Sequence, residues 1–90
     1  MTRIVITGAC GKMGRVINDI VNTRDDCEIT AGIDIAGEQY AEFPVYKKLF
    51  DLPEKPDVII DFSHPSLLDE LLDYCKINNV PVVIATTGYT

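Results

Sequence analysis

Ninety residues with 47% hydrophobic and 24% charged side chains indicate one globular domain rather than a disordered chain. The net charge of −6 argues against nucleic-acid binding and anionic membranes, and no apolar run reaches the roughly 18 residues that span a bilayer. The N-terminus lacks a secretory-type leader, which predicts a cytoplasmic location, and in that setting three cysteines without a C-x-x-C pair are predicted to be free thiols.

The first predicted element is a short strand that ends in glycines and leads directly into a helix. The apolar run 4–7 is typical of a parallel strand buried on both faces, and Gly8, Gly11 and Gly14 follow it. A helix is predicted over 12–22. One stripe of apolar residues at helical spacing supports it: Met13, Val16, Ile17, Ile20 and Val21.

A strand, a glycine turn and a helix in this order suit the pyrophosphate of a dinucleotide, because backbone N–H groups and the positive helix end meet at one point. Gly8 is expected to make the tight turn, Gly11 to let phosphate approach the backbone, and Gly14 to contact the strand. The N–H groups of Lys12 and Met13 would face the phosphates. The spacing is one residue longer than G-x-G-x-x-G, and a ligand-free helix entry is the alternative.

A second strand is predicted at Cys27 to Ile33, with Ile29, Ala31 and Ile33 alternating toward one face. The segment 36–56 is irregular and rich in glycine, proline and charge. It contains a possible edge strand at 43–46 and a helical turn at 47–52.

Asp34 ends the second strand, where a carboxylate can accept hydrogen bonds from both hydroxyls of the adenosine ribose. A solvated loop acid is the alternative. Ile35 stands where an arginine would favour a 2′-phosphate, so NADH is slightly favoured over NADPH. Lys12 and Arg15 remain able to accommodate NADPH.

The second half of the chain repeats the strand–helix pattern. Strands are predicted at 57–62 and 81–85, and a helix from Pro65 to about Asn79. Its apolar face is predicted to comprise Leu67, Leu68, Leu71, Leu72 and Cys75. The order predicts an open, mostly parallel sheet with helices on both faces. No helix covers the last strand, so we expect residues 1–90 to be the N-terminal part of a longer chain.

Two further segments follow the carboxyl ends of strands, where open α/β sheets bind ligands. Phe62 and Ser63 are candidates to lie along the cofactor, or else they close the strand and cap the helix. The next candidates, Thr86, Thr87 and Gly88, could hold the nicotinamide end, or they form an ordinary turn. His64 is the only histidine, so no histidine-based metal site is predicted within this chain, and we expect His64 to be a loop residue and assign it no catalytic role.

Read together, the G-x-x-G-x-M-G, DFS-x-P and TTG motifs resemble dihydrodipicolinate reductase, the 4-hydroxy-tetrahydrodipicolinate reductase of the diaminopimelate route to lysine. The resemblance covers the whole chain. It implies a Rossmann-like α/β domain that binds NADH or NADPH, a C-terminal domain that binds a small dicarboxylate substrate, and a homotetramer. The implied reaction is hydride transfer with loss of water.

The resemblance also implies roles for individual residues. Asp34 takes the acidic ribose position, where many relatives have Glu followed by Arg, and Ala85 stands where the family often has glycine. The loop residues Gly8 to Gly14 would hold the pyrophosphate. The family's histidine- and lysine-bearing substrate motif is not in this sequence, so the chain alone is expected to be inactive.

Two other classes of function remain open. Nicotinamide-dependent enzymes of the sugar-dehydrogenase or epimerase type begin with the same strand, glycine turn and helix, but they usually carry a lysine or a Tyr-x-x-x-Lys pair further on. A non-enzymatic nucleotide sensor or CoA-binding module would need an interaction surface of its own, and the sequence shows no basic or aromatic one.

Overall fold

The protein is described from a computed structural model that covers residues 1–35, 39, 41–62 and 67–84. Five strands form one sheet in the order β3-β2-β1-β4-β5, and each neighbouring pair is parallel. The strands are β1 (Thr2–Thr7), β2 (Cys27–Ile33), β3 (Val45–Tyr46), β4 (Val58–Asp61) and β5 (Val82–Ile84).

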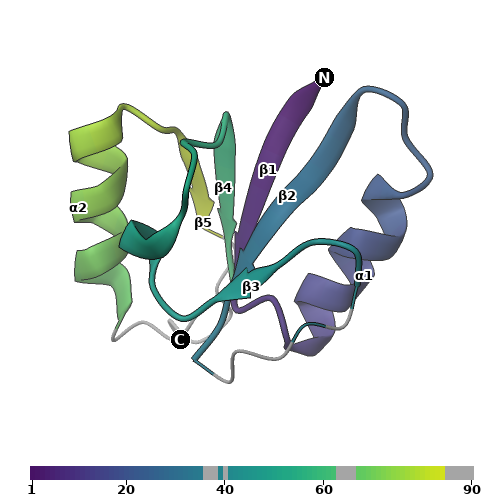
Figure 1. The fold of residues 1–90 in the computed structure, drawn as a ribbon, viewed down its shortest axis with the longest axis horizontal. Helices are drawn as coiled ribbons and strands as arrows, with labels where there is room; N and C mark the ends of the chain where they lie inside the picture. The colour runs from purple at the N-terminus through teal and green to yellow at the C-terminus, as the bar shows by residue number, and fades with distance from the viewer. Residues whose placement is uncertain (36–38, 40, 63–66, 85–90) are drawn as a thin grey trace.

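Helices cover both faces of this sheet. Helix α1 (Lys12–Val21) lies on one side, and α2 (Leu68–Asn78) lies on the other together with the short 3₁₀ turn η1 (Leu49–Asp51). Figure 1 shows the sheet nearly edge-on between the two helices, with β1, β2 and β4 ending at its lower rim. The predicted open parallel α/β sheet is therefore confirmed, including the short edge strand and the helical turn that follows it.

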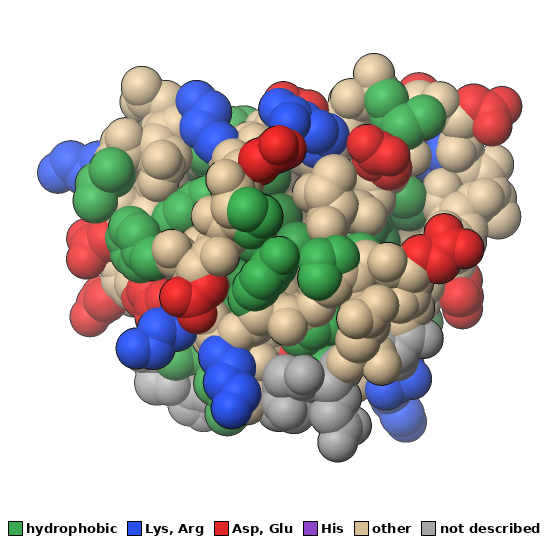
Figure 2. All heavy atoms as spheres, viewed as in Figure 1, with side chains coloured by type: hydrophobic (Ala, Val, Ile, Leu, Met, Phe, Trp, Pro, Cys, Tyr) green, Lys and Arg blue, Asp and Glu red, His purple; other side chains and the backbone are tan. Residues whose placement is uncertain are grey.

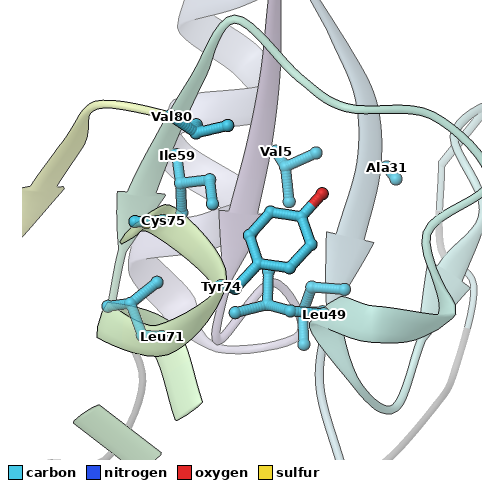
Figure 3. Packing of buried hydrophobic residues seen from close by; sticks show 9 residues of the cluster. Val5, Ala31, Leu49, Ile59, Leu71, Tyr74, Cys75 and Val80 are labelled. Carbon is cyan, nitrogen blue, oxygen red and sulfur yellow. The ribbon is translucent and has the colours of Figure 1, made fainter. Parts of the chain in front are cut away.

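The core has two layers because the sheet is covered on both faces. On the α2 face, the ring of Tyr74 lies among Val5, Ile59 and Leu49, as Figure 3 shows. Phe50 packs edge-on against this tyrosine, with ring centroids 5.3 Å apart. The layer on the α1 face is formed by the buried residues Ile4, Ile6, Ala9, Val21 and Phe43.

The predicted alternation along β2 is wrong in one respect. Ala31 and Ile33 pack on the α2 face, but Ile29 packs on the α1 face. The pairing slips by one residue at Thr30: Ile4 of β1 pairs with Ile29, while the next residue of β1 pairs with Ala31. An extra residue reverses the faces on either side of it, because side chains alternate with a period of two.

The buried line of α1 differs from the predicted apolar stripe. Gly14, Ile17 and Val21, at i, i+3 and i+7, face the sheet. The neighbouring row on the helix is about half exposed: Met13, Val16 and Ile20. The contact line is set by Gly14, whose backbone approaches the preceding loop closely, and the next row lies about 100° around the helix.

The buried face of α2 is likewise rotated from the predicted one. Leu71, Tyr74 and Cys75 are buried, whereas Leu67 is 37% and Leu72 is 45% exposed. The predicted apolar face did not include Tyr74, although this residue follows the buried Leu71 at helical spacing. Here the ring fills the space between the sheet and η1.

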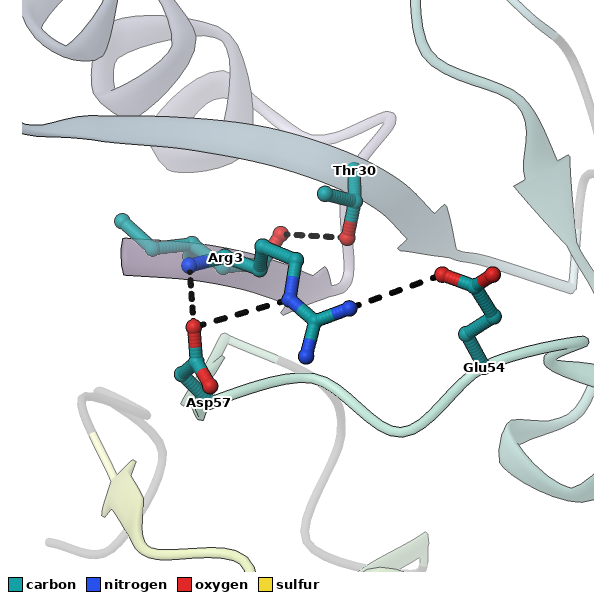
Figure 4. A network of polar contacts seen from close by, with 5 residues as sticks. Arg3, Thr30, Glu54 and Asp57 are labelled. Atoms are coloured by element: carbon teal, nitrogen blue, oxygen red, sulfur yellow. Dashed lines mark hydrogen bonds and ion pairs between the residues drawn. The ribbon is translucent and has the colours of Figure 1, made fainter. Parts of the chain in front are cut away.

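The amino ends of the strands are joined by a polar network on the rim opposite the glycine loop (Figure 4). Asp57 Oδ2 accepts a hydrogen bond from the Arg3 backbone N–H at 2.8 Å and lies 3.6 Å from the Arg3 Nε. The Arg3 Nη1 also lies 3.5 Å from Glu54 Oε2, and the Thr30 hydroxyl donates to the Ile4 carbonyl at 3.5 Å. The backbone hydrogen bond, followed by the charge of Arg3, holds the pKa of Asp57 below its usual value.

Strand β5 forms the far edge of the described sheet. Its Val83 is 56% and its Ile84 is 44% exposed, an unusual degree of exposure for a parallel strand. Across the described residues, no helix is long and apolar enough to cross a membrane.

Candidate nucleotide-binding site

The loop between β1 and α1 needs glycine at two positions for reasons within the protein. Gly8 has φ of 71°, a left-handed backbone conformation that strongly favours glycine. A Cβ on Gly14 would lie 2.4 Å from the carbonyl oxygen of Ala9, so any side chain there would force the loop and helix apart. A Cβ on Gly11 would meet only the Gly8 carbonyl oxygen, at an ordinary 3.4 Å. Packing within the protein therefore does not explain why residue 11 is a glycine.

The same loop is fastened to the end of β2. The Ile33 carbonyl accepts hydrogen bonds from the N–H groups of Gly8, at 2.7 Å, and Ala9, at 3.2 Å. One residue further along, Asp34 Oδ2 accepts a hydrogen bond from the Cys10 N–H at 3.0 Å. The predicted ribose carboxylate thus lies directly against the predicted phosphate loop, and the loop fixes its orientation.

Helix α1 begins at this loop, and its N-cap residue is Gly11. Because glycine has no side chain, the N-cap residue makes no side-chain hydrogen bond to the first N–H groups of the helix. The first turn of the helix carries no acidic residue. The first N–H groups of a helix have no partner within the helix and carry a partial positive charge. The Arg15 side chain adds to this charge, because its Nε donates to the Cys10 carbonyl at 3.3 Å.

A buried polar pair lies beneath the loop. Thr7 and Asp61, which end β1 and β4, are opposite each other in the parallel register and are 3% and 2% exposed. The Thr7 hydroxyl donates a hydrogen bond to Asp61 Oδ1. The Phe62 N–H then donates to the Thr7 carbonyl at 3.0 Å, which extends the pairing by one residue. Burial, followed by the nearby Asp61 charge, raises the pKa of the Cys75 thiol.

A cleft with a volume of about 420 Å³ opens beside the glycine loop, at the carboxyl edge of the sheet. The cleft is lined by Gly8 and Gly11 of the loop, by residues 33–35 and 47–49 that follow the adjacent strands β2 and β3, and by residues at the start of α2. Figure 2 shows apolar side chains in the middle of the face that carries β3, with charged side chains of both signs around its margin. A largely apolar cleft with a few polar groups at its mouth is typical of a small-molecule site.

The structure brings together part of the predicted site. Gly8, Gly11, Asp34 and Phe62 line the cleft. The first turn of α1 places Lys12, Met13 and Gly14 immediately beyond the loop. The other predicted residues lie outside the described part of the chain: Ser63, Thr86, Thr87 and Gly88.

Several residues of the cleft were not predicted as site residues. Lys47 and Lys48 follow β3, and Glu70 and Leu71 come from α2. The short strand at 45–46 was the available signal, because a strand beside β2 brings the residues after it to the end of β2. Within the described residues, no group of three or more His, Cys, Asp or Glu side chains is placed to hold a metal ion.

The strand order and the glycine loop at the end of the central strand define a Rossmann-like α/β domain. The family profile described as "Dihydrodipicolinate reductase, N-terminus" matches residues 2–90. The chain therefore belongs to the dihydrodipicolinate reductase family.

Curated relatives agree with this assignment. The chain is 41% identical over 90 residues to the 4-hydroxy-tetrahydrodipicolinate reductase of Clostridium novyi. This match covers all of the present chain and 36% of that protein. It is 40% identical to the corresponding Clostridium tetani protein, with 100% and 35% coverage. The chain thus spans about a third of the length of these relatives.

A solved structure also superposes on the whole chain. It is a dipicolinate-bound dihydrodipicolinate reductase from Paenisporosarcina sp. TG-14, with a TM-score of 0.82 and 34% sequence identity. The match covers 100% of this chain and 39% of that one. The predicted family and fold are confirmed.

Proposed function

We propose that this chain is the dinucleotide-binding part of a reductase that uses NADH or NADPH to convert 4-hydroxy-tetrahydrodipicolinate to tetrahydrodipicolinate, in diaminopimelate and lysine biosynthesis. The family membership supports the reaction. The observation that carries the cofactor assignment is the cleft of about 420 Å³ between the glycine loop, Asp34 and α2. It lies at the carboxyl edge of a parallel sheet, where this fold class binds nucleotides.

The glycine loop fits a pyrophosphate. Gly11 lines the cleft, and neither its backbone conformation nor its packing requires glycine, so its missing side chain leaves space for a ligand. The uncapped end of α1 directs N–H groups and partial positive charge to the same place. We assign the pyrophosphate to Gly8, Gly11, Lys12, Met13 and Gly14.

The remaining predicted residues are assigned along the edge of the sheet. Asp34 is positioned to accept hydrogen bonds from the adenosine ribose, because the Cys10 N–H holds its carboxylate beside the loop. Phe62 extends β4 at the cleft wall, and with Ser63 it would lie along the cofactor. The nicotinamide end is assigned to Thr86, Thr87 and Gly88.

The bound cofactor would supply the hydride, and the residues of this chain would bind and orient it. We assign no catalytic residue here. We propose that the proton donor and the groups that bind the dicarboxylate belong to a C-terminal domain, so the 90-residue chain alone should bind cofactor without turnover. The homotetramer is proposed on the family resemblance alone, and the cytoplasmic location on the sequence features given above.

Calorimetry on the 90-residue chain tests the cofactor assignment. Titration with NADH and with NADPH should release heat with one-to-one stoichiometry and raise the melting temperature, because a ligand that binds only the folded state stabilises it. Full-length gene product should oxidise the cofactor in the presence of 4-hydroxy-tetrahydrodipicolinate. A folded chain, judged by circular dichroism, that takes up neither dinucleotide would contradict the proposal.

A further inference from the structure

Two lysines that the family motifs do not include line the cleft beside Asp34. Lys47 and Lys48 follow β3 directly and are exposed. In the parallel register Ile33 pairs with Tyr46, and the Asp34 N–H donates to the Tyr46 carbonyl at 2.9 Å. The segments that follow β2 and β3 therefore leave the sheet side by side. Both lysines line the cleft next to the predicted ribose position.

The residue that follows Asp34 carries no charge. Ile35 is 75% exposed at the mouth of the cleft. In nucleotide-binding sheets of this class, a cation near the ribose carboxylate accommodates the 2′-phosphate of NADPH. A cation that binds a 2′-phosphate at this site would therefore have to come from another segment. The segment that lies beside Asp34 is 47–48.

The charges of the two lysines are available to a ligand. Among the described residues, no ion pair joins Lys47 or Lys48 to a carboxylate, and the ion pairs of Arg3 and Arg24 lie at other places in the fold. Of the residues that the structure describes, two carboxylates line the same cleft. Asp34 is engaged by the Cys10 N–H at 3.0 Å, and Glu70 lies on α2 across the cleft.

Positive charge is concentrated at this edge of an otherwise acidic molecule. The chain has eight lysines and arginines and a net charge of −6. Half of these cations belong to the cleft or to the helix end beside it: Lys12, Arg15, Lys47 and Lys48. A local cluster of one sign attracts an oppositely charged ligand despite the net charge of the molecule.

We propose that Lys47 and Lys48 form the subsite for the 2′-phosphate of NADPH, so that the chain binds NADPH more tightly than NADH. This inference rests on the proposed function and deepens it. It reverses the preference for NADH that the uncharged residue at position 35 suggests in the sequence. Each ammonium group would donate charge-assisted hydrogen bonds to the phosphate from the wall beside the ribose.

The test is the double variant Lys47→Gln/Lys48→Gln in the full-length gene product. Gln keeps most of the side-chain length and removes both charges. We expect the Kd for NADPH to rise about tenfold or more, because two charge-assisted contacts are lost, while the Kd for NADH changes less than about twofold. The pair 2′,5′-ADP and 5′-ADP, titrated by calorimetry, should show the same difference without the nicotinamide. The double variant Lys47→Arg/Lys48→Arg should restore the affinity for NADPH.

A charge-matched control separates a local contact from general attraction. Lys55→Gln/Lys76→Gln removes two positive charges from residues that do not line the cleft, and both dinucleotides should keep their affinity within about twofold. Equal weakening of NADPH and NADH by Lys47→Gln/Lys48→Gln would overturn the inference, and so would unchanged binding of NADPH. A wild-type protein that binds neither dinucleotide would contradict the proposed function itself, which is a different result.

Discussion

At Gly8 the backbone itself requires glycine, with φ of 71°, and at Gly14 the requirement comes from Ala9, whose carbonyl oxygen would lie 2.4 Å from a Cβ. Gly11 differs from both. A Cβ there would make only an ordinary contact of 3.4 Å with the Gly8 carbonyl oxygen, and Gly11 lines the cleft. The three glycines of the motif thus separate into two that shape the loop and one that leaves room for a ligand.

This separation predicts opposite effects for two alanine variants. Gly14→Ala should lower the free energy of unfolding by about 1–3 kcal/mol, because the loop and helix must move apart. Gly11→Ala should cost less than about 1 kcal/mol, the loss at an N-cap position, but weaken dinucleotide binding at least tenfold. Urea unfolding and calorimetry on both variants check this. A Gly11→Ala protein with unchanged affinity would remove the phosphate role of that residue.

At the scale of elements, the two ends of the strands are held by different means. At the carboxyl ends, the Thr7–Asp61 pair joins β1 to β4 inside the protein, beneath the loop. At the amino ends, Arg3 joins β1 to Asp57 and Glu54 in contact with solvent (Figure 4). Exposed pairs of this kind are screened and contribute little each. The buried pair is therefore the more sensitive of the two to substitution.

The exposed network makes stability depend on pH. The folded-state pKa of Asp57 is lowered by the Arg3 N–H and charge, so the ionised form stabilises the fold above its unfolded pKa of about 3.9. That contribution is lost as the pH falls through the lower, folded value. Asp57→Asn should be less stable than wild type at pH 7 and should lose less stability between pH 5 and pH 2. Urea unfolding at several pH values measures both slopes, and parallel slopes would show that Asp57 does not contribute.

Across the whole molecule, the core between the sheet and α2 is well buried, whereas apolar residues at the margins of the molecule are partly exposed. The α2 face buries Tyr74 and Cys75 against the sheet (Figure 3), whereas half-exposed apolar residues remain on α1 and on β5. These margins agree with a chain that spans about a third of the length of its relatives. We expect the core to open only when the whole domain unfolds.

Thiol labelling tests that expectation. Cys10 and Cys27 are partly exposed, whereas Cys75 is buried and its pKa is raised by burial. We predict that the first two react with a maleimide in the native state, while Cys75 reacts slowest and accelerates with urea in parallel with global unfolding. Mass spectrometry after timed quenching identifies each site. Rapid labelling of Cys75 in buffer would indicate local opening of α2 instead.

The sequence by itself determined the order of elements, because apolar periods of 2 and 3.6 residues and the glycine and proline breaks between them are local signals. It also identified the family and the residues at the ends of β1, β2 and β4. Which side of each helix is buried was decided by tertiary contacts. The contact of Gly14 with Ala9 sets the face of α1, and the extra residue at Thr30 reverses the faces of β2.

The lysines of the cleft show the same limit most clearly. Nothing local to Lys47 and Lys48 marks them as part of the proposed nucleotide site, since they follow a strand of two residues in an irregular segment. They become neighbours of Asp34 only because β3 pairs in parallel with β2. A motif that acts through its own backbone can be recognised from the sequence. A site assembled from separate strands can be recognised only from the folded structure, because its residues come together when the sheet forms.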